Sequence, residues 1–175
     1  MKKKSCSITL TFDLDRTDSP VTAKMLNEPH EALLVTRRWY DSKVDRKDWL
    51  TGGGVYFRMS GKKIYVGQTD DFYQRFNSHA SQKTGLRCWD VAICFKLPNT
   101  TKDFREFVEH ELSKCFKETD WICETDKTTT KTCDNVSVER IVETIWLLFR
   151  AYGYQCHYSG PQQELPLQPP HEGVV

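Results

Sequence analysis

Residues 54–79 have the sequence GVYFRMSGKKIYVGQTDDFYQRFNSH, and this stretch decides the fold. Its two tyrosine triplets, GVY ending at Tyr56 and YVG beginning at Tyr65, stand nine residues apart along the chain. Between them, apolar and polar residues alternate on both sides of Ser60 and Gly61, which is typical of two strands joined by a tight turn. The sequence therefore predicts a β-hairpin.

The register of this hairpin depends on the length of its turn. If the turn is a two-residue loop of Ser60 and Gly61, Tyr56 lies directly opposite Tyr65. Directly paired residues point to the same face of a sheet. The two phenols would then share a cationic face with the basic residues of the hairpin, and the other face would be apolar. A three-residue loop with a bulge would slip the register and separate the phenols.

A helix is predicted over about residues 70–81. Two acids at its start are favoured there by the helix dipole, and phenylalanines at positions 72 and 76 form a stripe that can pack on the hairpin. Arg75 and His79 are four residues apart and therefore lie on one face. One local unit thus gathers two phenols, a guanidinium and an imidazole.

This set of residues resembles the GIY-YIG nuclease family. The family signature is a Gly-Ile-Tyr-like triplet, a Tyr-Ile-Gly-like triplet about ten residues on, an Arg on the next helix, often a His one turn later, and a Glu on a later helix. The two triplets, Arg75 and His79 match its first four elements. The resemblance is strong over residues 52–80 and extends more loosely over residues 5–155. It implies an endonuclease that hydrolyses DNA phosphodiester bonds with a single Mg²⁺ ion, or Mn²⁺ in its place.

The acidic member of the signature must lie downstream. The segment FVEHEL resembles the family's Leu-Glu-x-x-Leu segment, with Glu109 at the acidic position. Glu109 is the predicted metal ligand. Glu111 competes, because helical spacing puts it near apolar residues, where a carboxylate needs a partner or a site; Glu106 is a third option. The family's Asn, about twelve residues beyond the Glu, is absent here, and Asp126 or a nearby threonine is the candidate substitute.

Each residue type has a physical task in phosphodiester hydrolysis. A phenol with a pKa of about 10 is a poor base unless neighbouring cations lower that pKa. With such cations nearby, Tyr56 is the predicted general base, and Tyr65 positions the water or a phosphate oxygen. In this hypothesis Arg75 would neutralise charge on the phosphoryl oxygens, Glu109 would hold the metal ion, and His79 would orient Tyr56 or share its proton.

The rest of the chain predicts an α+β architecture of antiparallel strands covered by helices. Further elements follow from periodicity and turn signals: strands over 6–14, 31–38 and 88–97, and helices over 21–26, 100–118 and 138–152. We divide the chain into an amino-terminal extension of residues 1–50, a nuclease-like core of residues 51–155, and a Pro-rich tail of residues 156–175 that we predict to be disordered.

Composition indicates one compact intracellular domain. With 175 residues, of which 38% are hydrophobic, the chain can bury a single core. No apolar run approaches membrane length, and the lysines at positions 2–4 lead into an alternating strand, so we predict a cytoplasmic protein with no membrane partner. Seven cysteines lack the spacing of a zinc ribbon, which favours reduced thiols.

Charge is distributed unevenly. The net charge is only +1, but residues 35–63 hold eight Lys or Arg against three Asp, whereas residues 102–126 hold four bases against eight acids. The basic stretch is interleaved with aromatic residues and leads into the hairpin, so it is suited to follow a phosphate backbone. The candidate nucleic-acid-binding residues are Arg37, Arg38, Lys43, Arg58 and Lys63. The alternative is a solvated loop.

Two functions remain open on the sequence alone. The first is the DNA endonuclease; cutting both strands with one site per chain would require a homodimer or two successive nicks. The second is a catalytically weak nucleic-acid-binding or protein-interaction module on the same fold, which the absent Asn and the modest net charge favour.

Overall fold

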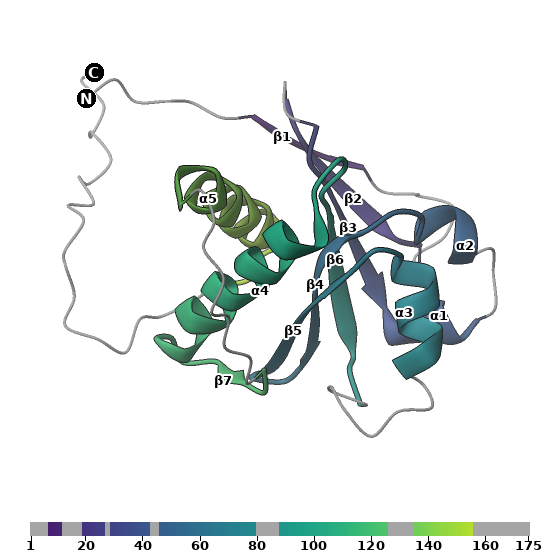
Figure 1. The fold of residues 1–175 in the computed structure, drawn as a ribbon. Helices are drawn as coiled ribbons and strands as arrows, with labels where there is room; N and C mark the ends of the chain where they lie inside the picture. The colour runs from purple at the N-terminus through teal and green to yellow at the C-terminus, as the bar shows by residue number, and fades with distance from the viewer. Residues whose placement is uncertain are drawn as a thin grey trace, which may run out of the picture.

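The computed structural model describes residues 7–11, 19–26, 29–42, 46–79, 88–125 and 135–155. The strands of this part of the chain form one mixed sheet in the order β1-β2-β3-β6-β4-β5-β7 (Figure 1). They are β1 (Ile8–Thr11), β2 (Val21–Met25), β3 (Glu31–Thr36), β4 (Gly54–Ser60), β5 (Lys63–Thr69), β6 (Val91–Lys96) and β7 (Ile122–Cys123). The helices are α1 (Arg37–Asp41), α2 (Arg46–Trp49), α3 (Phe72–His79), α4 (Lys102–Lys117) and α5 (Asn135–Ala151). Helices on a sheet of mostly antiparallel strands confirm the α+β class.

The hairpin of β4 and β5 is present, but its predicted register is wrong. Ser60 pairs with Lys63, so the loop consists of the next two residues, and Gly61 occupies its first position with a φ of 54°. A glycine with positive φ at the first loop position is what a type II′ turn requires. Tyr56 therefore pairs with Gly67, and Tyr65 lies diagonally from it on the same face, because the shift of the loop moves each partner by a full period of two residues.

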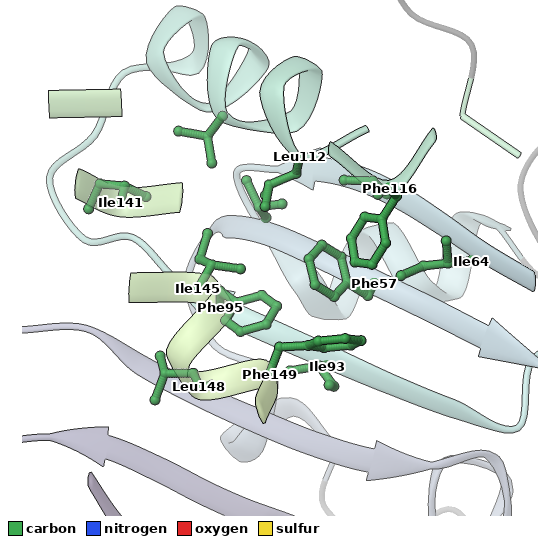
Figure 2. Packing of buried hydrophobic residues seen from close by; sticks show 14 of the residues in the cluster. Phe57, Ile64, Ile93, Phe95, Leu112, Phe116, Ile141, Ile145, Leu148 and Phe149 are labelled. Carbon is green, nitrogen blue, oxygen red and sulfur yellow. The ribbon is translucent and has the colours of Figure 1, made fainter. Parts of the chain in front are cut away.

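Helices cover both faces of the sheet (Figure 1). On one face, α4 and α5 bury the apolar side of the hairpin, with Phe57 at the centre. Its ring lies 4.9 Å from that of Phe95, 5.1 Å from Phe116 and 5.6 Å from Phe149 (Figure 2). On the other face, α1 and α3 pack over the two tyrosines of the hairpin. The sheet thus separates the larger apolar core from the face that carries the two tyrosines.

The amino-terminal extension differs most from the predicted elements. Residues 21–26 do not form a helix, because β2 is the middle strand of an antiparallel meander with β1 and β3. The basic stretch after β3 is not a plain loop, since Thr36 accepts a hydrogen bond from the backbone of Trp39 and caps α1. The predicted tail of residues 156–175 lies outside the described residues. Within the described ranges, no helix combines the length and apolarity needed to span a bilayer.

Candidate active site

Tyr56 is the centre of the site, and Gly67 makes room for it. A Cβ atom on Gly67 would lie 2.4 Å from Cζ of Tyr56 and 2.5 Å from its hydroxyl oxygen. The phenol ring therefore lies across the backbone of the opposite strand, and its hydroxyl ends at β5. The glycine of the second triplet is needed because a side chain there would occupy the space of the first tyrosine.

Helix α3 brings Arg75 to this hydroxyl. Backbone N–H groups at its start donate to carbonyls of the loop before β4, Phe72 to Gly52 at 3.0 Å and Tyr73 to Leu50 at 3.2 Å. These bonds fix the helix over the hairpin, and Nε of Arg75 donates to Oη of Tyr56 at 3.2 Å. The predicted stripe is confirmed, because the rings at positions 72 and 76 are buried against Tyr56. His79 ends α3, and its side chain lies outside the described part of the chain.

The two phenols are neighbours, but the pKa of Tyr56 moves opposite to the expectation. The rings of Tyr56 and Tyr65 lie 6.1 Å apart. Burial raises the pKa of Tyr56 well above its ordinary value and Tyr65 adds to the rise, while Arg75 and Arg58 oppose it only in part. Burial by itself would lower the pKa of Arg75, but the hydrogen bond to Tyr56 and the two phenols raise it. In the free protein the Tyr56 phenol is therefore protonated at neutral pH.

Arg58 is buried beneath the site, not displayed for DNA. Its side chain is only 3% exposed, and its guanidinium carbon lies 4.4 Å from the ring centre of Phe76 and 5.6 Å from that of Tyr56. Nε of Arg58 has no hydrogen-bond partner among the described residues, and burial lowers the pKa of the group. The prediction that Arg58 contacts a phosphate backbone at the surface is wrong, because the aromatic rings around it cover it.

Helix α1 was missed by the sequence analysis and borders the same face. Tyr40 is buried and donates from its hydroxyl to the Asn77 side chain of α3 at 2.8 Å. Arg37 pairs with Asp41 at 2.8 Å and lies over the ring of Trp89, while Arg38 is exposed. The threonine cap at position 36 was the sequence signal for this helix.

The other two residues of the predicted basic set fall apart from this cluster. Lys63 is exposed at the turn end of β5 and pairs with Glu124 at 3.4 Å. Lys43 lies outside the described residues. Of the predicted basic set, only Arg37 and Arg38 of α1 are therefore described at the surface beside the tyrosine face.

Glu109 comes to the hairpin from the other side of the sheet. Helix α4 runs antiparallel to β5, because Arg105 near its start pairs with Asp70 after β5, whereas Asp120 beyond its end pairs with Lys62 before β5. Glu109 lies one turn beyond Arg105 and is 1% exposed. It therefore stands beside β5, the strand across which the Tyr56 ring lies.

The competing acids occupy other sides of α4. Glu111 lines a groove between α4 and α5, together with Glu139 and Glu143 of α5. Glu106 lies 3.9 Å from Lys102 at the outer surface of the helix. Of the three acids, Glu109 alone lies in the buried stripe of α4.

A threonine stands close to the place of the missing Asn. Thr125 is buried, accepts a hydrogen bond from the backbone N–H of Val66 and donates one to its carbonyl, both at 2.8 Å. The hydroxyl thereby satisfies the edge of β5 where the short strand β7 has ended. Asp126, the other candidate, lies outside the described residues.

The described residues contain no group of three or more His, Cys, Asp or Glu side chains arranged for a metal ion. Cavities of about 490 and 480 Å³ lie against α4 and α5, and neither is lined by the tyrosines. The candidate catalytic side chains described above lie on the hairpin, on α3 and on the buried flank of α4.

A family model of the GIY-YIG catalytic domain matches residues 53–127. The chain carries a GIY-YIG catalytic domain. Searches among curated proteins and among solved structures found no match. The matched segment runs from just before β4 past β7 and includes α3 and α4. It therefore holds the two tyrosines, Arg75, Glu109 and Thr125, but not α1. GIY-YIG domains are nuclease domains, and the strands β1–β3 extend their sheet beyond the matched segment.

Proposed function

We propose that this GIY-YIG domain is a metal-dependent endonuclease that hydrolyses DNA phosphodiester bonds with one divalent ion. The observation that carries the proposal is the hydrogen bond from Nε of Arg75 to Oη of Tyr56, at 3.2 Å, with Tyr65 on the same face. This hydrogen bond connects Tyr56, which would accept a proton, to Arg75, which would stabilise the negative charge on the phosphate.

The residues fit a Mg²⁺ or Mn²⁺ ion held by Glu109. A carboxylate as buried as this one needs a cation or hydrogen-bond donors nearby, and hard oxygen donors are the ligands these ions prefer. When bound, the ion would polarise the phosphate and stabilise the leaving oxygen. A single protein carboxylate suits Mg²⁺, which usually keeps several waters.

In the proposed reaction, the oxygen of a water attacks phosphorus while the bond to the leaving oxygen breaks. The proton of this water passes to Oη of Tyr56. Burial keeps that phenol protonated in the free protein, so Tyr56 must lose its own proton as it gains the proton of the water. We assign the acceptance of the Tyr56 proton to His79, one turn beyond Arg75. Arg75 stabilises the charge on the phosphoryl oxygens, and Tyr65 positions the attacking water.

The test uses supercoiled plasmid with Mg²⁺ or Mn²⁺. We expect nicking that EDTA stops, and a loss of about 10²-fold or more in Arg75→Ala and Glu109→Ala, the range found for single groups that stabilise transition-state charge. Glu111→Gln is the matched control, because it removes a carboxylate from the same helix on its groove side. Nicking by Glu109→Ala at the rate of this control would refute the assignment.

A binding module is the second candidate, and one observation favours it. The protonated Tyr56 phenol cannot act as a base until its proton is removed. If this never happens, the protein would retard plasmid in a gel without cutting it at any pH. The endonuclease instead predicts a nicking rate that increases as the pH rises from about 6 to 9, because removal of the Tyr56 proton becomes easier at higher pH.

A further inference from the structure

A second oxygen donor lies on β5 beside the buried flank of α4. The side-chain oxygen Oε1 of Gln68 is buried and accepts no hydrogen bond from the described residues. Buried acceptors in native proteins nearly always have a partner, and an exception calls for a water or an ion at that place.

Gln68 points to the α4 side of the sheet. Side chains alternate along a strand, and Ile64 and Val66, the preceding residues of the same parity, belong to the core that packs against α4. Gln68 is the last residue of this row before the strand ends at Thr69, and it is the polar one. It therefore faces the helix at the end where α4 begins.

Gln68 on β5 and Glu109 on α4 lie at about the same distance from the Arg105–Asp70 pair, measured along the strand and along the helix. The pair of Arg105 with Asp70 ties α4 to the end of β5. From there, Glu109 is four helical residues along, a rise of about 6 Å. Gln68 is two strand residues back from Asp70, a distance of about 6.6 Å. Since the helix runs antiparallel to the strand, both steps lead in the same direction.

Two neighbouring polar side chains, Arg105 and Thr125, direct most of their polar atoms to other partners, but Nε of Arg105 is buried and has no hydrogen-bond partner among the described residues. Arg105 directs its terminal nitrogens to Asp70 and to the carbonyl of Thr100, the latter at 2.6 Å. The hydroxyl of Thr125 is bonded to both backbone groups of Val66. Gln68 and Glu109 thus offer an amide oxygen and a carboxylate on one seam, the kinds of oxygen that bind Mg²⁺ and Mn²⁺.

We propose that Oε1 of Gln68 is a second protein ligand for the divalent ion held by Glu109. The proposal rests on the single-ion function above and deepens it. A neutral amide fixes the ion without reducing its charge. Gln68 directly follows Gly67, and the hydroxyl of Tyr56 ends over Gly67 on the opposite face of the same strand. The ligand pair would therefore set the position of the ion relative to the proposed proton acceptor.

Binding of Mn²⁺ to the purified full chain tests this without DNA or cleavage, by titration calorimetry and by the loss of the free-ion paramagnetic resonance signal. We expect Gln68→Leu to weaken binding about tenfold or more, the range found when supporting residues of metal sites are removed. Gln68→Glu should tighten it, because a carboxylate replaces the amide. Glu109→Gln should abolish it, and Glu111→Gln should leave it unchanged.

The outcomes separate the two proposals. If Glu109→Gln abolishes binding but both Gln68 variants match the unmodified protein, the Gln68 assignment is wrong and the Glu109 site stands. If the unmodified protein binds no Mn²⁺ at millimolar concentration, the single-ion function fails together with this inference. Thermal unfolding of the apo variants checks the fold. The opposite signs expected for the Leu and Glu variants keep the test decisive if one of them is unstable.

Discussion

Replacement of Gly67 by alanine tests whether the Tyr56 ring must lie across the opposite strand. The new Cβ would sit 2.4 Å from Cζ of Tyr56, whereas ordinary contacts begin at about 3.4 Å. The ring must therefore move by about 1 Å. It is fully buried and packed against Phe72 and Phe76, so this movement also disturbs its neighbours.

The magnitude follows from the hydrogen bond that the movement breaks. Nε of Arg75 and Oη of Tyr56 are already 3.2 Å apart, near the upper limit for a hydrogen bond. A further separation of about 1 Å would break this hydrogen bond. Misplacement of a catalytic group by this amount costs about 10²-fold in rate. Overpacking costs about 1–3 kcal/mol of folding free energy, which lowers the melting temperature of a chain of this size by roughly 2–12 °C.

The assay is plasmid nicking beside thermal unfolding, with Gly61→Ala as the control. At Gly61 an added Cβ meets nothing within 4 Å, but the φ of 54° disfavours any side chain. This control should lose about 1–2 kcal/mol of stability and keep its nicking rate at temperatures where it is folded. Nicking by Gly67→Ala within threefold of the unmodified protein would refute the reasoning, as would an equal loss of rate in the Gly61 control.

Two further predictions concern buried groups. Arg58→Met should keep or raise the melting temperature, because it removes a buried charge that has no ion-pair partner among the described residues. It should also slow nicking about 10²-fold, since a charge about 6 Å from Tyr56 is worth roughly 3 kcal/mol at an effective dielectric constant of 20. A large loss of stability would contradict this prediction. Burial raises the pKa of the Tyr152 phenol in the folded chain, so on raising the pH the unfolded chain loses its phenol proton first. The stability that Tyr152 contributes is therefore fully present below about pH 10 and decreases as the pH rises above about 10. In urea titrations, Tyr152→Phe should be less stable than the unmodified protein at pH 7, because it lacks the hydrogen bonds from the hydroxyl to the carbonyls of Val21 and Ala32. This difference in unfolding free energy should become smaller by about 1.4 kcal/mol near pH 11. A difference that does not change with pH would show that the phenol has the same pKa in the folded and unfolded chains.

Local patterns predicted the elements whose contacts are local. The helix of Arg75 was predicted from the two acids at its start and the spacing of Phe72 and Phe76. The long helices α4 and α5 were predicted from their apolar periodicity, because a helix places residues three and four apart on one face whatever it packs against. The hairpin was predicted from alternation alone. Its register was not, because that depended on which loop position Gly61 occupies.

Short elements of the extension escaped the same reasoning. Five residues from Val21 are too few to distinguish a strand from a helix by period, and pairing with both neighbouring strands decided for β2. Helix α1 has only five residues and is stabilised by burial of Trp39 and Tyr40 on the hairpin face. In both cases long-range packing outweighs local propensity.

By itself, the sequence determined which groups are available for chemistry: the two tyrosine triplets, the Arg one helix later, and an acid on α4. The tertiary structure alone decided their state and selected among alternatives. It buried Arg58 against the rings of Tyr56, Phe76 and Trp89. It also raised the pKa of Tyr56, and it separated Glu109 on the seam with β5 from Glu111 in the groove with α5. The reason is that desolvation and packing depend on residues distant in the chain, which no local spacing records.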